Sequence, residues 1–112
     1  MSATDQGFQL VLTTAGSEDQ ARSLAKGLVE RRLAACVTIV GQACSVYRWK
    51  GKIEEEDEKL LLIKTEKRLF DELRIAIREL HSYEVPEVLA LPIDAGDADY
   101  LGWLSGCVQR GD

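Results

Sequence analysis

Apolar positions recur along this chain of 112 residues with two different periods, and they divide it into strand-like and helix-like segments. Runs of apolar and β-branched residues predict strands at residues 8–14, 33–49, 53–65 and 88–93. Apolar residues spaced three or four apart predict helices at residues 21–31, 67–80 and 100–108. Gly51 allows a turn between the second and third strands, so we expect these two to form one long hairpin with a polar tip.

The order of elements is β-α-β-β-α-β followed by one more helix, which predicts an α+β protein with a ferredoxin-like sandwich and an antiparallel sheet. We expect a single domain over residues 1–112, with its core between residues 8 and 108. Residues 34–40, 60–63 and 88–93 are mostly apolar, so both faces of these strands are expected to be buried. Since the predicted helices cover only one face, the pattern predicts that copies of the chain associate through their sheets.

Charge and cysteine content limit the partners and the cellular compartment that the protein can have. The formal net charge is −5, whereas a phosphate-binding surface needs positive charge, so we expect no nucleic-acid partner. Three cysteines without a C-x-x-C pair argue against structural zinc and disulfides, and indicate a reducing, cytoplasmic environment. The first residues lack the features of a signal peptide. The longest apolar run, residues 33–40, is far shorter than the ~20 residues that span a bilayer, so we expect no membrane association.

Six short segments carry a resemblance to a known family. In chain order they are Leu33–Ile39, Tyr47–Lys52, Lys64–Thr65, His81–Glu87, Leu91–Pro92 and Asp99–Leu104. Together, over about residues 10–104, they resemble the CutA family of divalent-cation tolerance proteins. The resemblance implies a ferredoxin-like homotrimer related in shape to the PII signalling proteins. It also implies a link to copper and other divalent ions, with no settled enzymatic activity.

The chain departs from the family pattern near the candidate metal site. Ser82 stands where the family often has proline after the histidine. Thr13 and Leu80 stand where some members linked to copper carry a cysteine and a second histidine. Only His81 therefore carries over as a matched ligand position.

The peptide from His81 to Glu87 lies between a predicted helix and a predicted strand, which is a frequent position for a ligand site. His81 is a candidate metal ligand through a ring nitrogen, with Glu84 or Glu87 as an oxygen partner. Imidazole and carboxylate together suit copper or zinc. The alternative is a helix C-cap, in which the histidine meets the free carbonyls at the end of the helix. Both interpretations stay open from the sequence.

Cys36 is a second candidate for copper, because its thiolate would be a soft ligand for Cu(I). Its neighbours Ala35 and Val37 favour instead a small, buried apolar residue. The acidic run at residues 54–58 could attract hydrated cations, but consecutive acids are more typical of a solvated loop or sheet edge.

A small-molecule pocket and a subunit interface are also predicted. The pocket candidates are Lys64, Tyr83 and Glu87, and the likeness to PII proteins would place such a pocket between subunits. The alternative for Lys64 is an ion pair with a carboxylate that fixes the trimer. Large aromatic side chains dominate contact energies at interfaces. We therefore expect the subunit interface to include Tyr47, Trp49 and Trp103.

Two functions of different class follow from these observations. The first is a trimeric protein that binds copper or another divalent cation and takes part in the response to metal ions. The second is a PII-like sensor or scaffold that binds a small anionic metabolite at the subunit interface. An enzyme and an organic cofactor are not expected, because the chain has none of the common catalytic motifs and its one histidine leaves little equipment for acid–base catalysis.

Overall fold

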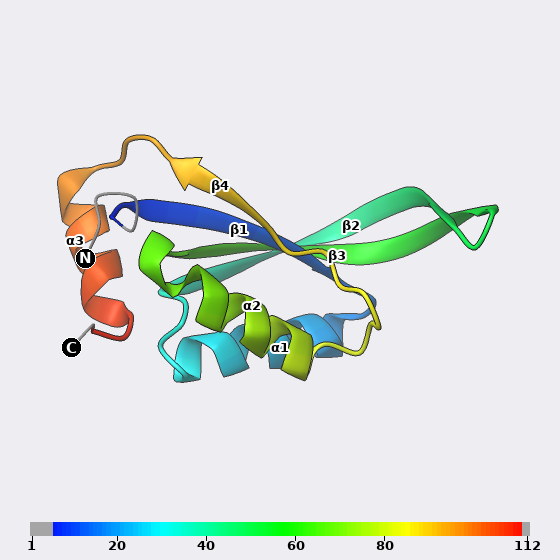
Figure 1. Ribbon diagram of the computed structural model, residues 1–112, viewed down its shortest axis with the longest axis horizontal. Helices are drawn as coiled ribbons and strands as arrows, with labels where there is room; N and C mark the ends of the chain where they lie inside the picture. The colour runs from blue at the N-terminus through cyan, green and yellow to red at the C-terminus, as the bar shows by residue number, and fades with distance from the viewer. Residues whose placement is uncertain (1–5, 111–112) are drawn as a thin grey trace.

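The computed structural model describes residues 6–110, which form a four-stranded sheet with helices packed against it (Figure 1). The elements follow the chain in the order β1 (Phe8–Ala15), α1 (Glu18–Glu30), β2 (Cys36–Trp49), β3 (Lys52–Glu66), the single-turn helix η2 (Lys67–Leu69), α2 (Phe70–Leu80), β4 (Leu89–Ile93) and α3 (Ala98–Cys107). The predicted order of strands and helices is therefore confirmed. Within the described residues, none of the helices has the length and apolar character needed to cross a bilayer.

The sheet has the strand order β2-β3-β1-β4, and every neighbouring pair is antiparallel. The first and third strands lie in the centre, as in a ferredoxin-like sandwich, so the predicted α+β fold is confirmed. Leu12 of β1 stands opposite Leu62 of β3 on one side and opposite Leu89 of β4 on the other. The register therefore aligns apolar side chains across the centre of the sheet.

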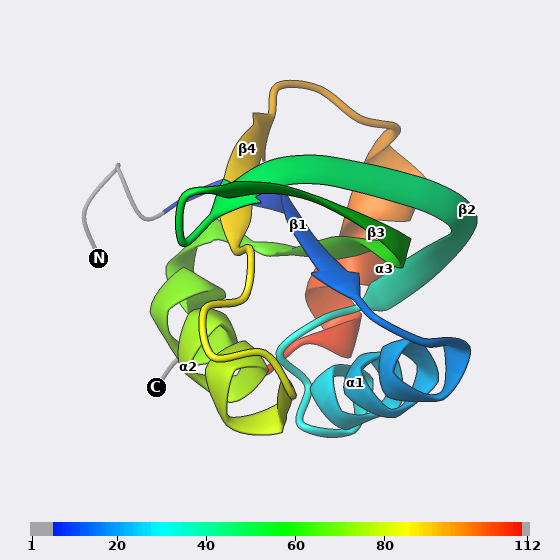
Figure 2. The same cartoon turned by 90° about the vertical axis from the view of Figure 1, so that its right-hand side faces the viewer.

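Helices α1 and α2 lie together against one face of the sheet (Figure 2). The hydroxyl of Ser17 begins α1 by accepting a hydrogen bond from the backbone N–H of Gln20 at 3.1 Å. Burial of one large aliphatic side chain contributes about 1.5–3 kcal/mol. The helices and the sheet bury such side chains against one another, among them Val11, Leu24, Leu28, Leu61, Ile63, Leu73 and Ile77.

Strand β2 begins at Cys36, whereas the apolar pattern predicts its start at Leu33. Arg32 has a positive φ of 57°, and the backbone N–H of Leu33 donates to the carbonyl of Leu28 at 3.0 Å, which closes the end of α1. Residues 33–35 are buried, Leu33 and Ala34 in the core between helices and sheet and Ala35 in the cluster around Leu104. Their apolar character therefore reflects core packing, although Ala35 also bonds to the backbone of β3, where its N–H donates to the carbonyl of Lys64 at 2.9 Å.

The β2-β3 hairpin extends well beyond the helices (Figure 1), which confirms the predicted long hairpin. A register shift between Val40 and Ala43 marks a bulge, where Gln42 has a φ of 60°. The turn at the tip is made by Lys50 and Gly51, with φ values of 51° and 82°. The outer half of the hairpin is thus held by strand pairing and the local twist.

The second face of the sheet has no layer formed by α1 and α2 (Figure 2). Its positions alternate along the strands with core residues such as Val11 and Ile63. In the single chain this face is not buried as the apolar strands predict, since Val40, Leu89 and Leu91 are 42–56% exposed. A monomer therefore presents an apolar sheet surface to water.

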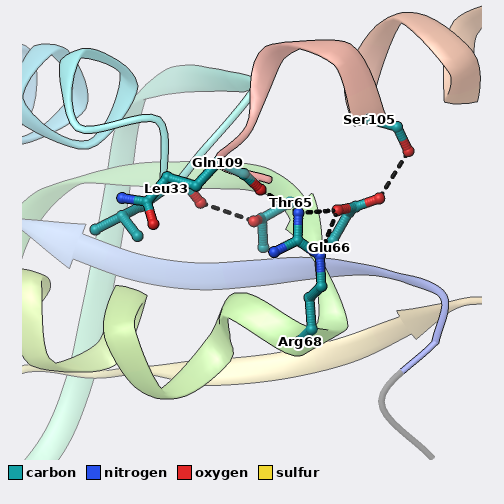
Figure 3. A network of polar contacts seen from close by, with 6 residues as sticks. All are labelled: Leu33, Thr65, Glu66, Arg68, Ser105 and Gln109. Atoms are coloured by element: carbon teal, nitrogen blue, oxygen red, sulfur yellow. Dashed lines mark hydrogen bonds and ion pairs between the residues drawn. The ribbon is translucent and has the colours of Figure 1, made fainter. Parts of the chain in front are cut away.

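A polar network fastens the C-terminal segment at the end of the sheet (Figure 3). Arg68 pairs with Glu66 at 2.7 Å and donates to the backbone carbonyl of Gln109. Ser105 of α3 donates to the second carboxylate oxygen of Glu66 at 2.7 Å. Together with the fully buried Leu104, these bonds explain how a helix as short as α3 keeps a defined position.

Candidate functional site

His81 lies where α2 ends, and its ring ties the following loop to β1. Its backbone N–H donates to the carbonyl of Ile77 at 2.9 Å. Ring Nε2 donates to the backbone carbonyl of Thr14 at 2.6 Å, and ring Nδ1 accepts from the backbone N–H of Tyr83 at 3.0 Å. A neutral imidazole with its proton on Nε2 satisfies both contacts. His81 is therefore the C-cap residue of α2, as the alternative interpretation has it, while its ring binds a carbonyl of β1 and not one of α2.

These contacts bear directly on the predicted metal-ligand role of His81. The residue is 8% exposed, and both ring nitrogens already have partners. A metal needs a ring nitrogen with a free lone pair, so coordination would require the contact with Thr14 or with Tyr83 to open. Among residues 6–110, no three His, Cys, Asp or Glu side chains are grouped closely enough to hold an ion.

Tyr83 lies in the same loop and contacts a buried carboxylate of β3. Its hydroxyl donates to Oε2 of Glu58 at 2.8 Å. Burial raises the pKa of the Tyr83 phenol well above its usual value, and the hydrogen bond to Glu58 and the charge of that carboxylate raise the pKa further. Glu58 is 7% exposed, and within the described part of the chain it forms no ion pair.

Glu58 is a residue that the sequence interpretation missed. It belongs to the acidic run at residues 54–58, which predicts a solvated edge, and the other members of that run are exposed or half-buried. The sequence held one indication that Glu58 is buried, namely its position as the acid nearest the apolar residues 60–63 of the same strand. Strand periodicity cannot show that the loop after α2 closes over it.

A groove of about 740 Å³ opens between the loop and the hairpin. Four glutamates line it, and none of its lining residues is Lys, Arg or His. The hydroxyl of Tyr47 donates to one of these glutamates, Glu56, at 3.4 Å. The groove is therefore acidic with aromatic walls. Its lining residues are Thr14, Ser45, Val46, Tyr47, Trp49, Glu56, Glu58, Tyr83, Glu84, Val85, Pro86 and Glu87.

The structure brings together five of the residues predicted for three different roles. Glu84 and Glu87, predicted as metal ligands, share the groove with Tyr83, which like Glu87 is also a pocket candidate. The same groove contains Tyr47 and Trp49, which are predicted to be interface residues. One surface thus contains some of the residues of each of the metal, pocket and interface predictions.

Other predicted residues lie elsewhere in the chain. Lys64 and Cys36 are opposite each other on β3 and β2, with the Lys64 ammonium 3.8 Å from the Cys36 sulfur. The same ammonium donates to the hydroxyl of Thr38 at 2.8 Å. Cys36 is half-buried beside this charge, and not the fully buried apolar residue of the alternative interpretation. Trp103 is on α3 and is 49% exposed, and it packs on Tyr100 with 5.5 Å between ring centroids.

Within one chain, Lys64 therefore does not join Tyr83 and Glu87 in the groove, and Cys36 lies outside it as well. Cys44 is exposed on the hairpin. Cys107 packs against the cluster formed around Leu104 and Val108.

The model of a protein family described as CutA1 divalent ion tolerance protein matches residues 9–107. The chain belongs to the CutA1 family. The divalent-cation tolerance protein CutA of Thermus thermophilus is 51% identical to it over 96 residues, which cover 86% of this chain and 93% of that relative. Human Protein CutA is 47% identical over 91 residues, 81% of this chain. This chain spans about half of the human protein's length, since the match covers 51% of it.

Solved CutA structures share the fold of this CutA1 chain. The divalent cation tolerance protein of Thermus thermophilus has a TM-score of 0.88 at 48% identity, with 91% of this chain and 99% of that chain covered. The structure of the periplasmic divalent cation tolerance protein CutA from Archaeoglobus fulgidus has the same TM-score at 36% identity, with 91% and 99% covered. The resemblance carried by the six sequence segments is confirmed.

Proposed function

We propose that this CutA1 protein supports tolerance to divalent cations by binding them as a homotrimer. Membership of a family named for divalent ion tolerance supports the metal-tolerance role. The observation that supports the binding proposal is the acidic groove, because four glutamates line it and no lysine, arginine or histidine does. Carboxylate oxygens are suitable ligands for divalent cations.

The second face of the sheet supports the proposed homotrimer. Its exposed leucines and valine form the kind of apolar surface that is uncommon on monomers. Tyr47 and Trp49 lie on the projecting hairpin and are 40% and 43% exposed, so they are available to contact a neighbouring copy. We assign the same role to Trp103 of α3. Sedimentation velocity on the purified chain tests the assembly, and a single-chain mass at low micromolar concentration would contradict it.

The groove end formed by Glu84 and Glu87 is the proposed cation site. Both side chains are exposed, so they are accessible to a hydrated ion. His81 would join copper or zinc only after its ring releases Thr14 or Tyr83. Cys36 lies outside the groove, so its proposed role is a separate Cu(I) contact on the open sheet face.

Calorimetry with Cu(II) and with Zn(II) tests the cation site. We expect the heat of binding to be lost in the double variant Glu84→Gln/Glu87→Gln and to persist in Glu55→Gln, which removes an acid outside the groove. Loss in His81→Ala as well would show that the site needs His81, either as a ligand or to hold the loop that carries Glu84 and Glu87. The proposal would be contradicted if the wild-type protein gave no heat of binding with Cu(II) and none with Zn(II).

A second candidate function is the PII-like sensor with a ligand at the subunit interface. The groove favours it by its size, because small-molecule sites commonly enclose about 300–1,000 Å³. An anionic metabolite would need positive charge that the groove lining does not supply, so Lys64 of the partner subunit would have to provide it. Calorimetry with ATP on wild type and Lys64→Met tests this arrangement, and heat that persists in the variant would count against it.

We further propose a cytoplasmic protein without catalytic activity or an organic cofactor. The CutA1 family is named for ion tolerance and not for a reaction. The free thiols of Cys36, Cys44 and Cys107 suit a reducing compartment. Fractionation of the cells that make the protein tests the location, and recovery from a periplasmic fraction would contradict it. Turnover on any substrate panel would contradict the absence of catalysis.

A further inference from the structure

Glu58 carries a buried carboxylate for which the described chain supplies no positive charge. It is 7% exposed, and it accepts a hydrogen bond from Tyr83. Within residues 6–110 no lysine, arginine or histidine pairs with it. A carboxylate withdrawn from water is costly unless a cation or several donors lie beside it. Because Glu58 also lines the groove, a cationic ligand there would supply the missing counter-charge.

The hairpin side of the groove offers aromatic surface to such a ligand. Tyr47 and Trp49 are both partly exposed, and Tyr47 bonds to the carboxylate of Glu56. The ammonium of Lys50 already lies 6.0 Å from the centroid of the Trp49 ring. Aromatic rings attract cations that lie within about 6 Å of their centroids. The indole of Trp49 therefore already has a primary ammonium group at its side in the folded chain.

The size of the groove and its remaining walls favour an organic cation over a bare metal ion. A volume of about 740 Å³ is many times what one ion needs and suits a small molecule. Val85 and Pro86 provide apolar wall that would contact methylene groups. The absence of basic groups from the lining disfavours an anion.

We propose that the groove binds a small organic amine in its ammonium form. One ammonium group lies against Glu58, and the carbon chain lies between the aromatic rings of the hairpin and the wall formed by Val85 and Pro86. This ligand class goes beyond the proposed metal function, and it does not depend on whether His81 coordinates copper.

Calorimetry on the oligomer as purified tests the ligand class with three probes of similar length. Putrescine is the diamine, butanediol is its neutral analogue, and succinate is an anion. We expect a heat of binding with putrescine and none with butanediol or succinate. Equal binding of butanediol would show that only apolar contact matters, and preferential binding of succinate would show an anion site. Either result overturns the proposal, as does the absence of putrescine binding at millimolar concentration.

Two variants test the assigned residue. Glu58→Gln removes the charge but keeps an oxygen that can accept from Tyr83, and we expect it to weaken putrescine binding about tenfold or more. Glu55→Gln removes an equal charge outside the groove and should keep the affinity within about twofold. Equal losses in both variants would indicate unspecific attraction by net charge and would overturn the assignment. If Glu58→Gln does not fold, the comparison of probes on wild type still decides.

The metal proposal fails separately from this one. His81→Gln keeps an amide that can donate to Thr14 and hold the loop. It is expected to keep putrescine binding whether or not it changes the heat of copper binding, because His81 does not itself line the groove. Putrescine binding in a protein that shows no copper heat would therefore support the amine site while contradicting the metal site. Copper binding without putrescine binding would support the metal site and contradict the amine site.

Discussion

The phenol of Tyr83 donates to Oε2 of Glu58 at 2.8 Å, which joins the loop after α2 to the hairpin strand β3. The same loop is held at its start by His81, whose ring donates to the carbonyl of Thr14 in β1. Two buried or partly buried polar contacts thus position the segment that carries Glu84 and Glu87. The shape of the acidic groove depends on both of them.

Replacing Tyr83 by phenylalanine removes one of these contacts and leaves the Glu58 carboxylate buried. We expect the free energy of unfolding to fall by about 1–3 kcal/mol, because a buried acceptor loses its donor. Urea denaturation at one fixed protein concentration measures the change. Tyr100→Phe is the control, since Tyr100 is 43% exposed on α3 and its change should stay within about 0.5 kcal/mol. Equal stability of Tyr83→Phe and wild type would show that the hydrogen bond makes no net contribution to the free energy of unfolding.

The raised pKa of Tyr83 predicts a dependence of stability on alkaline pH. The folded chain holds the phenolic proton more tightly than the unfolded chain, in which a tyrosine pKa is about 10. The contribution of Tyr83 to stability is therefore complete below pH ~10 and is lost as the pH rises through the raised value of the folded state. Comparison with Tyr83→Phe separates this residue from the other tyrosines. We expect wild type to lose stability more steeply than the variant above pH ~10, and parallel curves would contradict this.

Replacing His81 tests how firmly the loop is held. His81→Ala loses both ring contacts, and we expect the free energy of unfolding to fall by about 1–3 kcal/mol. His81→Gln keeps an amide that can donate to Thr14, so it should recover part of the loss. Cleavage after Glu84 by a glutamate-specific protease reports on the loop itself. It should be faster in His81→Ala than in wild type, and equal cleavage rates would show that the ring does not restrain the loop.

The fold could be predicted from the sequence because its elements depend on local periodicity. Leu24 and Leu28 recur at helical spacing and are fully buried in the core, as the pattern of α1 requires. The error at the start of β2 arose because residues 33–35 are apolar for a tertiary reason, namely their burial in the two core clusters. Local periodicity does not distinguish that kind of burial from a strand.

The candidate site could be predicted only in part, because register and loop closure are not local properties. The loop residues Tyr83, Glu84 and Glu87 were identified from the composition of one short peptide, and all three line the groove. Cys36 and Lys64 are cross-strand neighbours because of the register of β2 against β3, and no short segment of sequence specifies that register. Glu58 was missed for the same reason, since its burial depends on a loop 25 residues away along the chain.

The exposed sheet face predicts which substitutions dissociate the protein. Leu91 of β4 and Ile75 of α2 are similarly exposed, at 44% and 48%, but Leu91 pairs with Leu10 on the face without α1 and α2. Burying a carboxylate in an apolar interface without a partner is costly. We therefore expect Leu91→Asp to sediment as single chains at low micromolar concentration, while Ile75→Asp keeps the mass of wild type. Trp49→Ala should weaken the assembly as well, because it removes a large aromatic contact from the hairpin. The same mass for both aspartate variants would show that the assembly does not use this face.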